Sequence, residues 1–324
     1  FNNRIRLEGD FYDSQSLDLL LNVPVPTITG YSTQMQNIGK VQNRGMEFTL
    51  NTKKLTGEFS WSSNFNISFN KNKVLEVGVD GRPIYGSAAN ANNAFITKPG
   101  YPIASFYGYK YIGVFQSEEE LAKYPHLSGD KVGDGRYEDV NKDGVLDQND
   151  KTILGDNNPL FTAGFSNSFS YKNFTLDIQF TGSYGAEVFS FYKRMCGIYH
   201  GDRNGMIEQL GRWQSKDQPG DGIHFRPTRT PSGWQRDPSS AWVQDASYLR
   251  LRNLTLGYNF DQKVLDKMKM KGLRLYVTGQ NLFTITNYVG YDPETSSESG
   301  LAQGGDYLGY PAARSFIIGA NITF

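Results

Sequence analysis

The sequence contains no long uninterrupted run of hydrophobic residues. A membrane-spanning helix needs about 18 or more consecutive apolar residues, and no stretch of this chain approaches that length. The mean hydropathy is -0.52, although 14% of the residues are aromatic, with 20 Tyr and 21 Phe. An aromatic chain that is polar on average must place its apolar residues singly between polar ones. This composition excludes helical membrane spans and is compatible with β-strands.

Cysteine and histidine are scarce, and neither sign of charge is in excess. The 33 basic residues cancel the 33 acidic residues, which removes the electrostatic basis for nucleic-acid binding. Cys196 is the only cysteine, so no intrachain disulfide can form. The three histidines lack the spacing of a zinc site, and no Gly-x-Ser-x-Gly motif or convincing Cys–His pair is present. We therefore predict that the protein is not an enzyme.

The clearest pattern in the chain is the alternation within residues 164–184. Apolar residues occupy every second position on both sides of Lys172 and Asn173, which predicts a β-hairpin with a very tight turn. One face is predicted to contact lipid through Phe165, Phe169, Phe174, Leu176, Ile178 and Phe180. The opposite face is predicted to line an aqueous lumen with Asp177, Gln179 and Thr181.

Similar alternation predicts about ten strands in the whole chain. The band from Phe59 to Phe69 matches the roughly 9–11 residues that a tilted strand needs to cross a bilayer. A change of parity near Arg252 and Asn253 predicts a β-bulge, and residues 264–270 predict a short helix. The strands are predicted at 4–21, 45–52, 59–69, 89–97, 103–115, 164–171, 174–184, 248–260, 273–283 and 316–324.

The predicted connections fall into two length classes. Short turns are expected at 53–57, 98–101, 172–173 and 261–271, and long loops at 21–43, 71–88, 117–159, 188–244 and 285–312. Short periplasmic turns opposite long extracellular loops are typical of bacterial outer-membrane barrels. The chain, residues 1–324, is therefore predicted to be all-β and to form part of a transmembrane antiparallel β-barrel. The alternative is a soluble β-sandwich binding module, whose apolar face packs on a second sheet.

Residues 139–150 have the sequence DVNKDGVLDQND. Oxygen donors at loop positions 1, 3, 5, 7, 9 and 12, with glycine at position 6, are typical of EF-hand calcium loops. Position 12 is Asp instead of Glu, as in dockerin-type loops, so calcium or magnesium fits. We predict an extracellular metal-binding loop within 129–155, or a dockerin-like calcium loop in the sandwich alternative; an acidic loop without metal is the other interpretation. The predicted ligands are Asp139, Asn141, Asp143, the Val145 carbonyl, Asp147 and Asp150.

The longest connection is rich in aromatic residues. Trp213, Trp234 and Trp242 occur in it together with several Tyr, Phe and Arg residues. Aromatic rings beside hydrogen-bonding groups can stack on sugar rings or hold a peptide, so these three are candidate substrate-binding residues. Packing of the loop on itself or on a partner protein is the alternative interpretation.

Seven segments spread along the chain carry a family resemblance. They are 36–48 (QNIGKVQNRGMEF), 64–75 (NFNISFNKNKVL), 100–109 (GYPIASFYGY), 139–155, 247–258 (SYLRLRNLTLGY), 273–283 (LRLYVTGQNLF) and 321–324 (NITF). In this order they resemble the SusC/RagA-like TonB-dependent outer-membrane transporters. The resemblance covers nearly the whole chain and points to the C-terminal part of the family's barrel.

The resemblance implies active import of a large nutrient, an oligosaccharide or a peptide, across the bacterial outer membrane. In this family a 22-stranded barrel holds an N-terminal plug, a TonB box couples it to the inner membrane, and a SusD-like surface lipoprotein covers it. No segment here resembles the plug, the TonB box or a signal peptide, so we expect an N-terminal portion to complete the barrel. The expected partners are the lipoprotein, TonB, outer-membrane lipid and the solute, with no organic cofactor.

Overall fold

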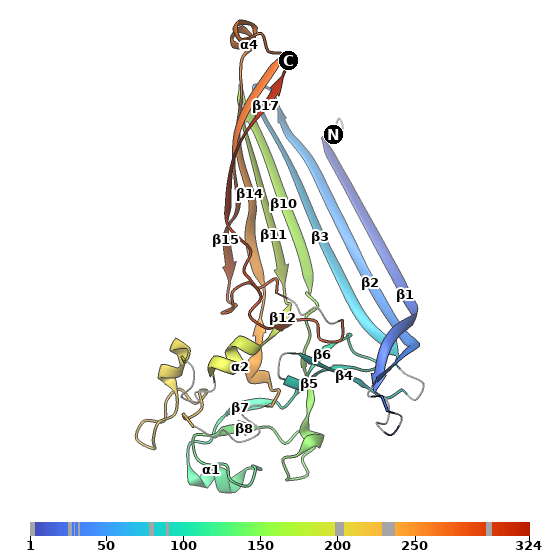
Figure 1. The fold of residues 1–324 in the computed structure, drawn as a ribbon, viewed down its shortest axis with the longest axis vertical. Coiled ribbons are helices and arrows are strands. Elements are labelled where there is room, and N and C mark those ends of the chain that lie inside the picture. Colours follow the sequence, from blue (N-terminus) through green and yellow to red (C-terminus); the bar gives the residue numbers. More distant parts are fainter. Residues whose placement is uncertain are drawn as a thin grey trace.

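The computed structural model describes residues 4–324 apart from 25–27, 29, 32, 78–80, 89–90, 198–203, 229–236 and 296–299. It consists of one tall antiparallel sheet with a smaller group of strands and helices at one end (Figure 1). The order of the eight strands in the sheet is β1-β2-β3-β10-β11-β14-β15-β17. Their bounds are β1 (Ile5–Pro24), β2 (Thr33–Thr56), β3 (Phe59–Glu76), β10 (Phe161–Tyr171), β11 (Phe174–Tyr184), β14 (Tyr248–Asn259), β15 (Gly272–Thr286) and β17 (Ser315–Thr323).

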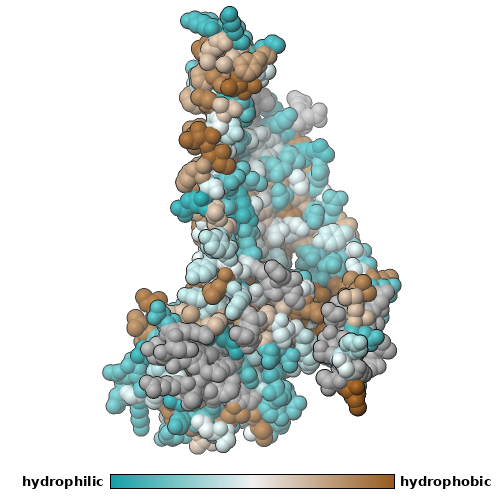
Figure 2. Space-filling model, in the orientation of Figure 1, coloured by the Kyte–Doolittle hydropathy of each residue, from teal (hydrophilic) through white to brown (hydrophobic). Residues whose placement is uncertain are grey.

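Strand pairing gives the sheet an apolar face, called the outer face, and a polar face, called the inner face. Successive strand residues point to opposite faces, so the alternation in the sequence produces this division directly. Figure 2 shows mainly hydrophilic residues over the middle of the sheet. One outer row is Leu7, Leu50, Phe65, Phe165, Phe180, Leu251 and Phe283. One inner row is Arg6, Asn51, Asn64, Ser166, Gln179, Asn253, Gln280 and Ser315.

Among the described residues, no second sheet covers the outer face. Phe65, Phe165 and Phe283 are 37%, 40% and 43% exposed. β10 and β11 contain 11 residues each, the length that a tilted strand needs to cross a bilayer. The soluble β-sandwich interpretation is therefore wrong, because it requires an apolar face buried against a second sheet. The predicted division of residues 164–184 between two faces is confirmed.

The local features predicted at the short connections are also confirmed. Lys172, with a φ of 50°, and Asn173 form the two-residue turn between β10 and β11. The helix α4 (Gln262–Met268) joins β14 to β15. Pairing in β14 shifts at Arg252, which is the extra residue of a bulge. Both turns lie at the end of the sheet that also carries the two chain termini (Figure 1).

The loop domain, defined as the described residues of 81–160, 185–247 and 287–314, lies at the opposite end of the sheet (Figure 1). The helices in it are α1 (Glu118–Lys123), α2 (Phe191–Gly197), η2 (Gln148–Asp150), η3 (Ile207–Gly211) and η4 (Ser240–Trp242). The strands in it are β4 (Ile84–Ala88), β5 (Ala91–Thr97), β6 (Ser105–Gly108), β7 (Tyr111–Val114), β8 (Gly135–Tyr137), β9 (Thr152–Gly155), β12 (Glu187–Ser190), β13 (Val243–Asp245) and β16 (Gly305–Asp306). None of the described helices is long and apolar enough to cross a membrane.

Two strands that were predicted for the barrel wall belong to the loop domain. Residues 89–97 contain β5, and residues 103–115 contain β6 and β7, so the sheet has eight strands instead of about ten. Phe95, Phe106 and Tyr109 are fully buried, so their apolar pattern reflects the core of the loop domain instead of contact with lipid. Alternation reports the two faces of a strand, but it does not report which sheet the strand joins.

The predicted long loop at 21–43 is also shorter than expected. β1 continues to Pro24 and β2 begins at Thr33, and these two strands pair up to that point. Pro24 is the last residue of β1, which lies at the edge of the described sheet, where a proline is tolerated because its missing N–H can face away from the neighbouring strand. The hairpin therefore extends well beyond the band of apolar residues.

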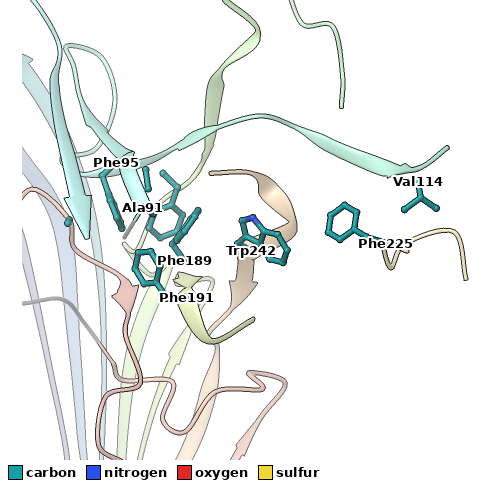
Figure 3. Packing of buried hydrophobic residues seen from close by; sticks show 10 residues of the cluster. Ala91, Phe95, Val114, Phe189, Phe191, Phe225 and Trp242 are labelled. Atoms are coloured by element: carbon teal, nitrogen blue, oxygen red, sulfur yellow. The ribbon is translucent and has the colours of Figure 1, made fainter. Parts of the chain in front are cut away.

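Segments distant in sequence meet in the core of the loop domain (Figure 3). The rings of Phe95, Phe106 and Phe189 pack with centroids 5.6, 5.9 and 6.1 Å apart. Trp242 is 2% exposed, and its ring lies 6.0 Å from that of Phe225. Burial of one Phe side chain contributes on the order of 1.5–3 kcal/mol, so this cluster holds the long connections together as one folded unit.

We expect Ile178→Arg to prevent assembly in the membrane. Ile178 lies near the middle of β11 on the outer face, where an arginine facing lipid costs about 2–4 kcal/mol. Gln179→Arg adds the same charge to the inner face and should assemble normally. Membrane fractionation and heat-modifiable migration in gels measure assembly. Equal behaviour of the two variants would contradict the assignment of the faces.

Candidate functional site

The inner face of the sheet is a continuous hydrogen-bonding surface. Asn64 Nδ2 donates to Asn51 Oδ1 at 2.7 Å, and the hydroxyls of Thr255 and Thr278 lie 2.8 Å apart. A hollow of about 500 Å³ lies beside β1, β2, β3 and β10. Such a surface suits the passage of a hydrophilic solute, because polar groups can replace the solute's water contacts. The hollow is lined mainly by Arg4, Arg6, Asn51, Lys53, Ser62, Asn64, Ser166 and Ser168.

Two of the three predicted substrate-binding tryptophans lie in the interior of the loop domain. The Trp242 indole N–H donates to the backbone carbonyl of Asp237 at 3.3 Å, and the Trp242 ring is buried. Trp213 is partly buried and packs against the same core. Trp234 lies outside the described residues. The structure thus shows packing for Trp213 and Trp242, and substrate contact by any of the three stays a prediction.

A hollow of about 150 Å³ opens beside Trp242 and combines an aromatic wall with charged groups. His224, which lines it, contacts Asp221 with Nδ1 2.5 Å from Oδ2. Burial opposes ionisation of Asp221, but the N–H groups of His224 and Ile223 together with the His224 side chain outweigh burial and lower the pKa of Asp221. Its lining includes Tyr111, Lys193, Glu208, Gln209, His224, Phe225 and Trp242.

A charged cluster connects the loop domain to the large sheet, which we also call the wall. Arg250 is 3% exposed and lies on the inner face of β14. It donates to Asp292 Oδ1 at 2.6 Å and to Glu294 Oε2 at 2.7 Å. Arg252, at the bulge, contacts Glu294 and donates to Thr181 Oγ1 at 3.0 Å. We call Arg250, Arg252, Asp292 and Glu294 the arginine latch.

The arginine latch attaches the described part of residues 287–314 to the large sheet. Asp292 Oδ2 also accepts the Ala312 N–H at 3.0 Å, so one carboxylate ties two distant points of this segment to the wall. Burial alone would raise the pKa of Asp292, but Arg250 and the N–H groups of Ala312 and Glu294 outweigh burial and lower it. Asp292 therefore stays ionised at neutral pH and compensates the buried Arg250.

A second buried carboxylate, Asp306, organises the same segment. Asp306 is 2% exposed and accepts hydrogen bonds from the Tyr288 hydroxyl, from Thr295 Oγ1 at 3.1 Å and from the Gly309 N–H at 3.1 Å. Burial, followed by the contact with Asp306, raises the pKa of Tyr288. Asp292 thus ties the segment to the sheet, and Asp306 ties separate positions of the segment to one another.

The predicted metal loop forms a tight turn held by its own side chains. Asp139 accepts the N–H groups of Lys142 at 2.7 Å and Gly144 at 2.8 Å, and Gly144 adopts a φ of 83°. The side chains of Asn141, Asp143 and Asp147 each accept the N–H two residues further on. Left-handed backbone at Gly144 is the sharp turn that the sequence pattern predicts at position 6.

Asp150, at position 12 of the loop, uses its carboxylate oxygens for hydrogen bonds within the protein. It is fully buried, and its oxygens accept the N–H groups of Val140 at 2.9 Å and Asp147 at 2.8 Å. Within the part of the chain that the structure describes, no three His, Cys, Asp or Glu side chains form a group that could hold a metal ion. The oxygen-rich donor set suits a hard cation, but its positions do not converge in this structure. Metal binding by the loop stays a prediction.

Known proteins similar to this chain identify its family. No protein-family model matches it. Over its whole length it is 36% identical to TonB-dependent receptor P3 of Formosa agariphila and 29% identical to TonB-dependent receptor SusC of Bacteroides thetaiotaomicron. Its fold matches the RagAB peptide transporter with a TM-score of 0.81 at 23% identity, again over the whole chain. This chain is a SusC/RagA-like TonB-dependent receptor segment.

The receptor segment spans 33% of the length of receptor P3, 30% of SusC and 34% of the matched RagAB chain. About a third of a receptor is thus represented, and the likeness to RagAB at 23% identity shows the fold alone. The named relatives are receptors and a transporter, which is consistent with the prediction that the protein is not an enzyme.

Sequence reasoning did not identify the arginine latch of the receptor segment. The sequence contained one signal, the equal spacing of two charged pairs. Arg250 and Arg252 are two residues apart, and so are Asp292 and Glu294. Without the strand register, nothing in the sequence brings these two pairs together across more than 40 positions. Arg250 and Arg252 share the inner face because they are two residues apart on β14, and the structure adds the placement of the acidic segment against that face.

We expect Asp292→Asn to release residues 287–314 from the receptor wall. Removal of one partner of a buried ion pair costs up to about 3–5 kcal/mol, and the cost here is at the lower end because Glu294 still pairs with Arg250. Limited proteolysis should then cut within 287–314 faster than in the wild type. Glu138→Gln removes an exposed pair with Lys110 and serves as the matched control, with an expected cost below about 1 kcal/mol.

The pH dependence of proteolysis within 287–314 gives a second test of the role of Asp292. The pKa of Asp292 is lower in the folded state than its ordinary value of 3.8, so the stability it contributes is present above that value. That stability is lost as pH falls through the lowered pKa. Wild-type protection of 287–314 should therefore decline only in this acid range, and Asp292→Asn should lack the decline. An identical acid profile in both proteins would contradict the latch.

Proposed function

We propose that the receptor segment forms part of the wall and the outer loops of a TonB-dependent importer in the bacterial outer membrane. The observation that carries this proposal is the sheet itself, which is apolar on the outer face and polar on the inner face. The loop domain at one end supports the same assignment, because outer-membrane barrels have long loops on the extracellular side only. TonB-dependent receptors are outer-membrane proteins, which agrees with this placement.

The imported compound is proposed to be a large hydrophilic nutrient, either an oligosaccharide or a peptide. The hydrogen-bonding inner face and the hollow beside Trp242 suit either class, since both present hydroxyl or amide groups. One structural neighbour is described as a peptide transporter, and one relative is SusC. We further propose a SusD-like surface lipoprotein as the partner at the loop domain, and TonB as the partner that supplies energy through residues outside this chain.

Uptake by cells tests the import function. Cells that carry the full-length receptor should accumulate a fluorescently labelled oligosaccharide pool or peptide pool, and cells in which its gene is deleted should not. Dissipation of the proton-motive force should abolish uptake to the level of the deletion, because TonB draws on that force. A complemented strain controls for secondary effects of the deletion. Uptake that persists without the receptor, or without the proton-motive force, would rule out this function.

We propose that the 139–150 loop binds calcium, or magnesium, and that the ion pins the loop instead of taking part in chemistry. Asp139, Asn141, Asp143, the Val145 carbonyl, Asp147 and Asp150 are the proposed ligands. The exposed position of Val145 and the second lone pair of each carboxylate oxygen support the proposal. Asp139, Asp143 and Asp147 would have to turn toward a common point for binding.

Two substitutions separate metal binding from loop folding. Asp150→Asn replaces one of two buried carboxylate oxygens, each of which accepts an N–H group, with an NH2 group that cannot accept, and should open residues 129–155 to protease with or without calcium. Asp143→Asn should leave the chelated protein unchanged and should remove only the protection that calcium adds. The measurement is limited proteolysis in calcium and in chelator. Equal wild-type cleavage in both conditions would refute metal binding.

A further inference from the structure

The outer face carries positive charge immediately beyond its apolar band. On β1, β2 and β3 the band ends with Phe11, Met46 and Phe69, which pair or neighbour one another in the register. Toward the loop domain, the next residues on the outer face are Arg44 of β2 and Lys71 of β3, which pair with each other. Lys73 follows two residues further along β3 on the same face. Cations therefore follow the apolar residues without a gap.

A hollow of about 600 Å³ lies where these two zones meet. Phe11, Met46 and Phe69 line its apolar half, together with Leu160, which is 66% exposed. The ring of Phe69 lies 6.0 Å from that of Phe161 on β10. The other half of the lining contains Arg44, Lys71 and Lys73. A ligand that fills the hollow must be apolar at one end and must accept positive charge at the other.

The charge balance of the hollow favours an anion. Arg44 is held by Asp13, with Nη2 2.7 Å from Oδ2. Lys71 and Lys73 are exposed, and neither takes part in a salt bridge among the described residues. The carboxylate in the lining, Asp156, already accepts the N–H and the side-chain amide of Asn158 at 2.9 and 2.8 Å. Three cations, Arg44, Lys71 and Lys73, thus stand against two carboxylates, Asp13 and Asp156, and the one net positive charge favours an incoming anion.

The height of these lysines matches the headgroup layer of a membrane. Lys71 and Lys73 lie two and four residues beyond Phe69, which is roughly 7 and 13 Å along a strand and less along the normal of a tilted one. The headgroup layer is roughly 5–8 Å thick on each side of the hydrocarbon core. A soluble anion would leave the apolar half of the hollow unused, whereas a lipid fills both halves.

A second hollow on the same face shows that positive charge is specific to the first one. This hollow of about 470 Å³ lies over β10, β11, β14 and β15 and also faces outward. Its lining includes Phe165, Tyr184 and Ile285, but its charged residue is Asp245, and it contains no Lys or Arg. Apolar hollows are therefore common to the outer face, and the cationic rim belongs to β2 and β3.

We propose that the hollow bounded by Phe11, Phe69, Arg44, Lys71 and Lys73 binds a phosphate-bearing lipid of the membrane leaflet on the loop side. The acyl chains lie along the apolar half, and the phosphate contacts Lys71 and Lys73. This site rests on the proposed membrane location of the receptor. It holds the receptor wall to its membrane at a fixed height, independently of the solute that the receptor imports.

The test uses the full-length receptor in phosphatidylcholine nanodiscs that contain dioleoyl phosphatidic acid or dioleoylglycerol. These two lipids have the same acyl chains and differ in the phosphate. Native mass spectrometry of the released receptor measures the retained lipid. Wild type should retain phosphatidic acid, and the Lys71→Gln/Lys73→Gln variant should bind it about 30-fold more weakly, at roughly fivefold for each lysine. Both proteins should bind dioleoylglycerol equally weakly.

Two control variants complete the design. Lys71→Arg/Lys73→Arg should retain phosphatidic acid, because the charge remains. Lys123→Gln/Lys216→Gln removes the same charge from the loop domain and should bind like wild type. Unchanged binding by Lys71→Gln/Lys73→Gln, an equal loss in Lys123→Gln/Lys216→Gln, or displacement of the lipid by inorganic phosphate would overturn the site.

Heat-modifiable migration of each protein reports membrane assembly separately from lipid retention. An assembled wild-type receptor that does not retain phosphatidic acid would refute the lipid site and leave the proposed function intact. Failure of the wild type to assemble in the membrane would refute the proposed function itself. If Lys71→Gln/Lys73→Gln fails to assemble, comparison of Lys71→Gln alone with Lys71→Arg alone decides the question, with about fivefold weaker binding expected for Lys71→Gln.

Discussion

The constraint on which this structure depends is that a backbone in lipid must satisfy its own hydrogen bonds. Each strand that is not at an edge of the sheet forms backbone hydrogen bonds with both neighbouring strands. A backbone paired in this way tolerates hydrocarbon on its outer face. Among the described residues, β1 and β17 are the edges of the sheet. Strand alternation then follows, because each strand must present apolar side chains to one side and polar ones to the other. The rows through Phe165 and Ser166 show this division at adjacent positions.

The loop domain has a different requirement, since its long connections do not belong to the large sheet and must be ordered by packing. The aromatic core around Phe95, Phe189 and Trp242 supplies the burial that these polar, glycine-rich segments lack individually. The arginine latch then fixes one of them to the wall. A buried arginine is costly without compensation, so the latch makes the position of residues 287–314 conditional on two carboxylates. Inner-face shape and loop position are thereby linked.

The two faces of one strand can serve two environments at once. On β3, the outer side chains change from Phe69 to Lys71 and Lys73 within four residues, while Asn70 and Asn72 on the inner side bind Asn43. On this strand the change from apolar to cationic side chains is therefore confined to the outer face. The inner face remains polar on both sides of that change. The proposed lipid contact and the proposed passage of solute thus use different faces of the same strands.

The sequence by itself determined the fold class, the division of the hairpin 164–184 between two faces, the bulge at Arg252 and the turn at Lys172, because each depends on residues close together in the chain. The family resemblance followed from motifs in order. Tertiary structure alone decided that residues 89–97 and 103–115 leave the wall for the loop domain, since alternation is the same in either sheet. It also decided that Trp242 is buried, that Asp150 serves as an internal acceptor, and that Arg250 meets Asp292. These contacts depend on register between distant strands, which no local pattern specifies.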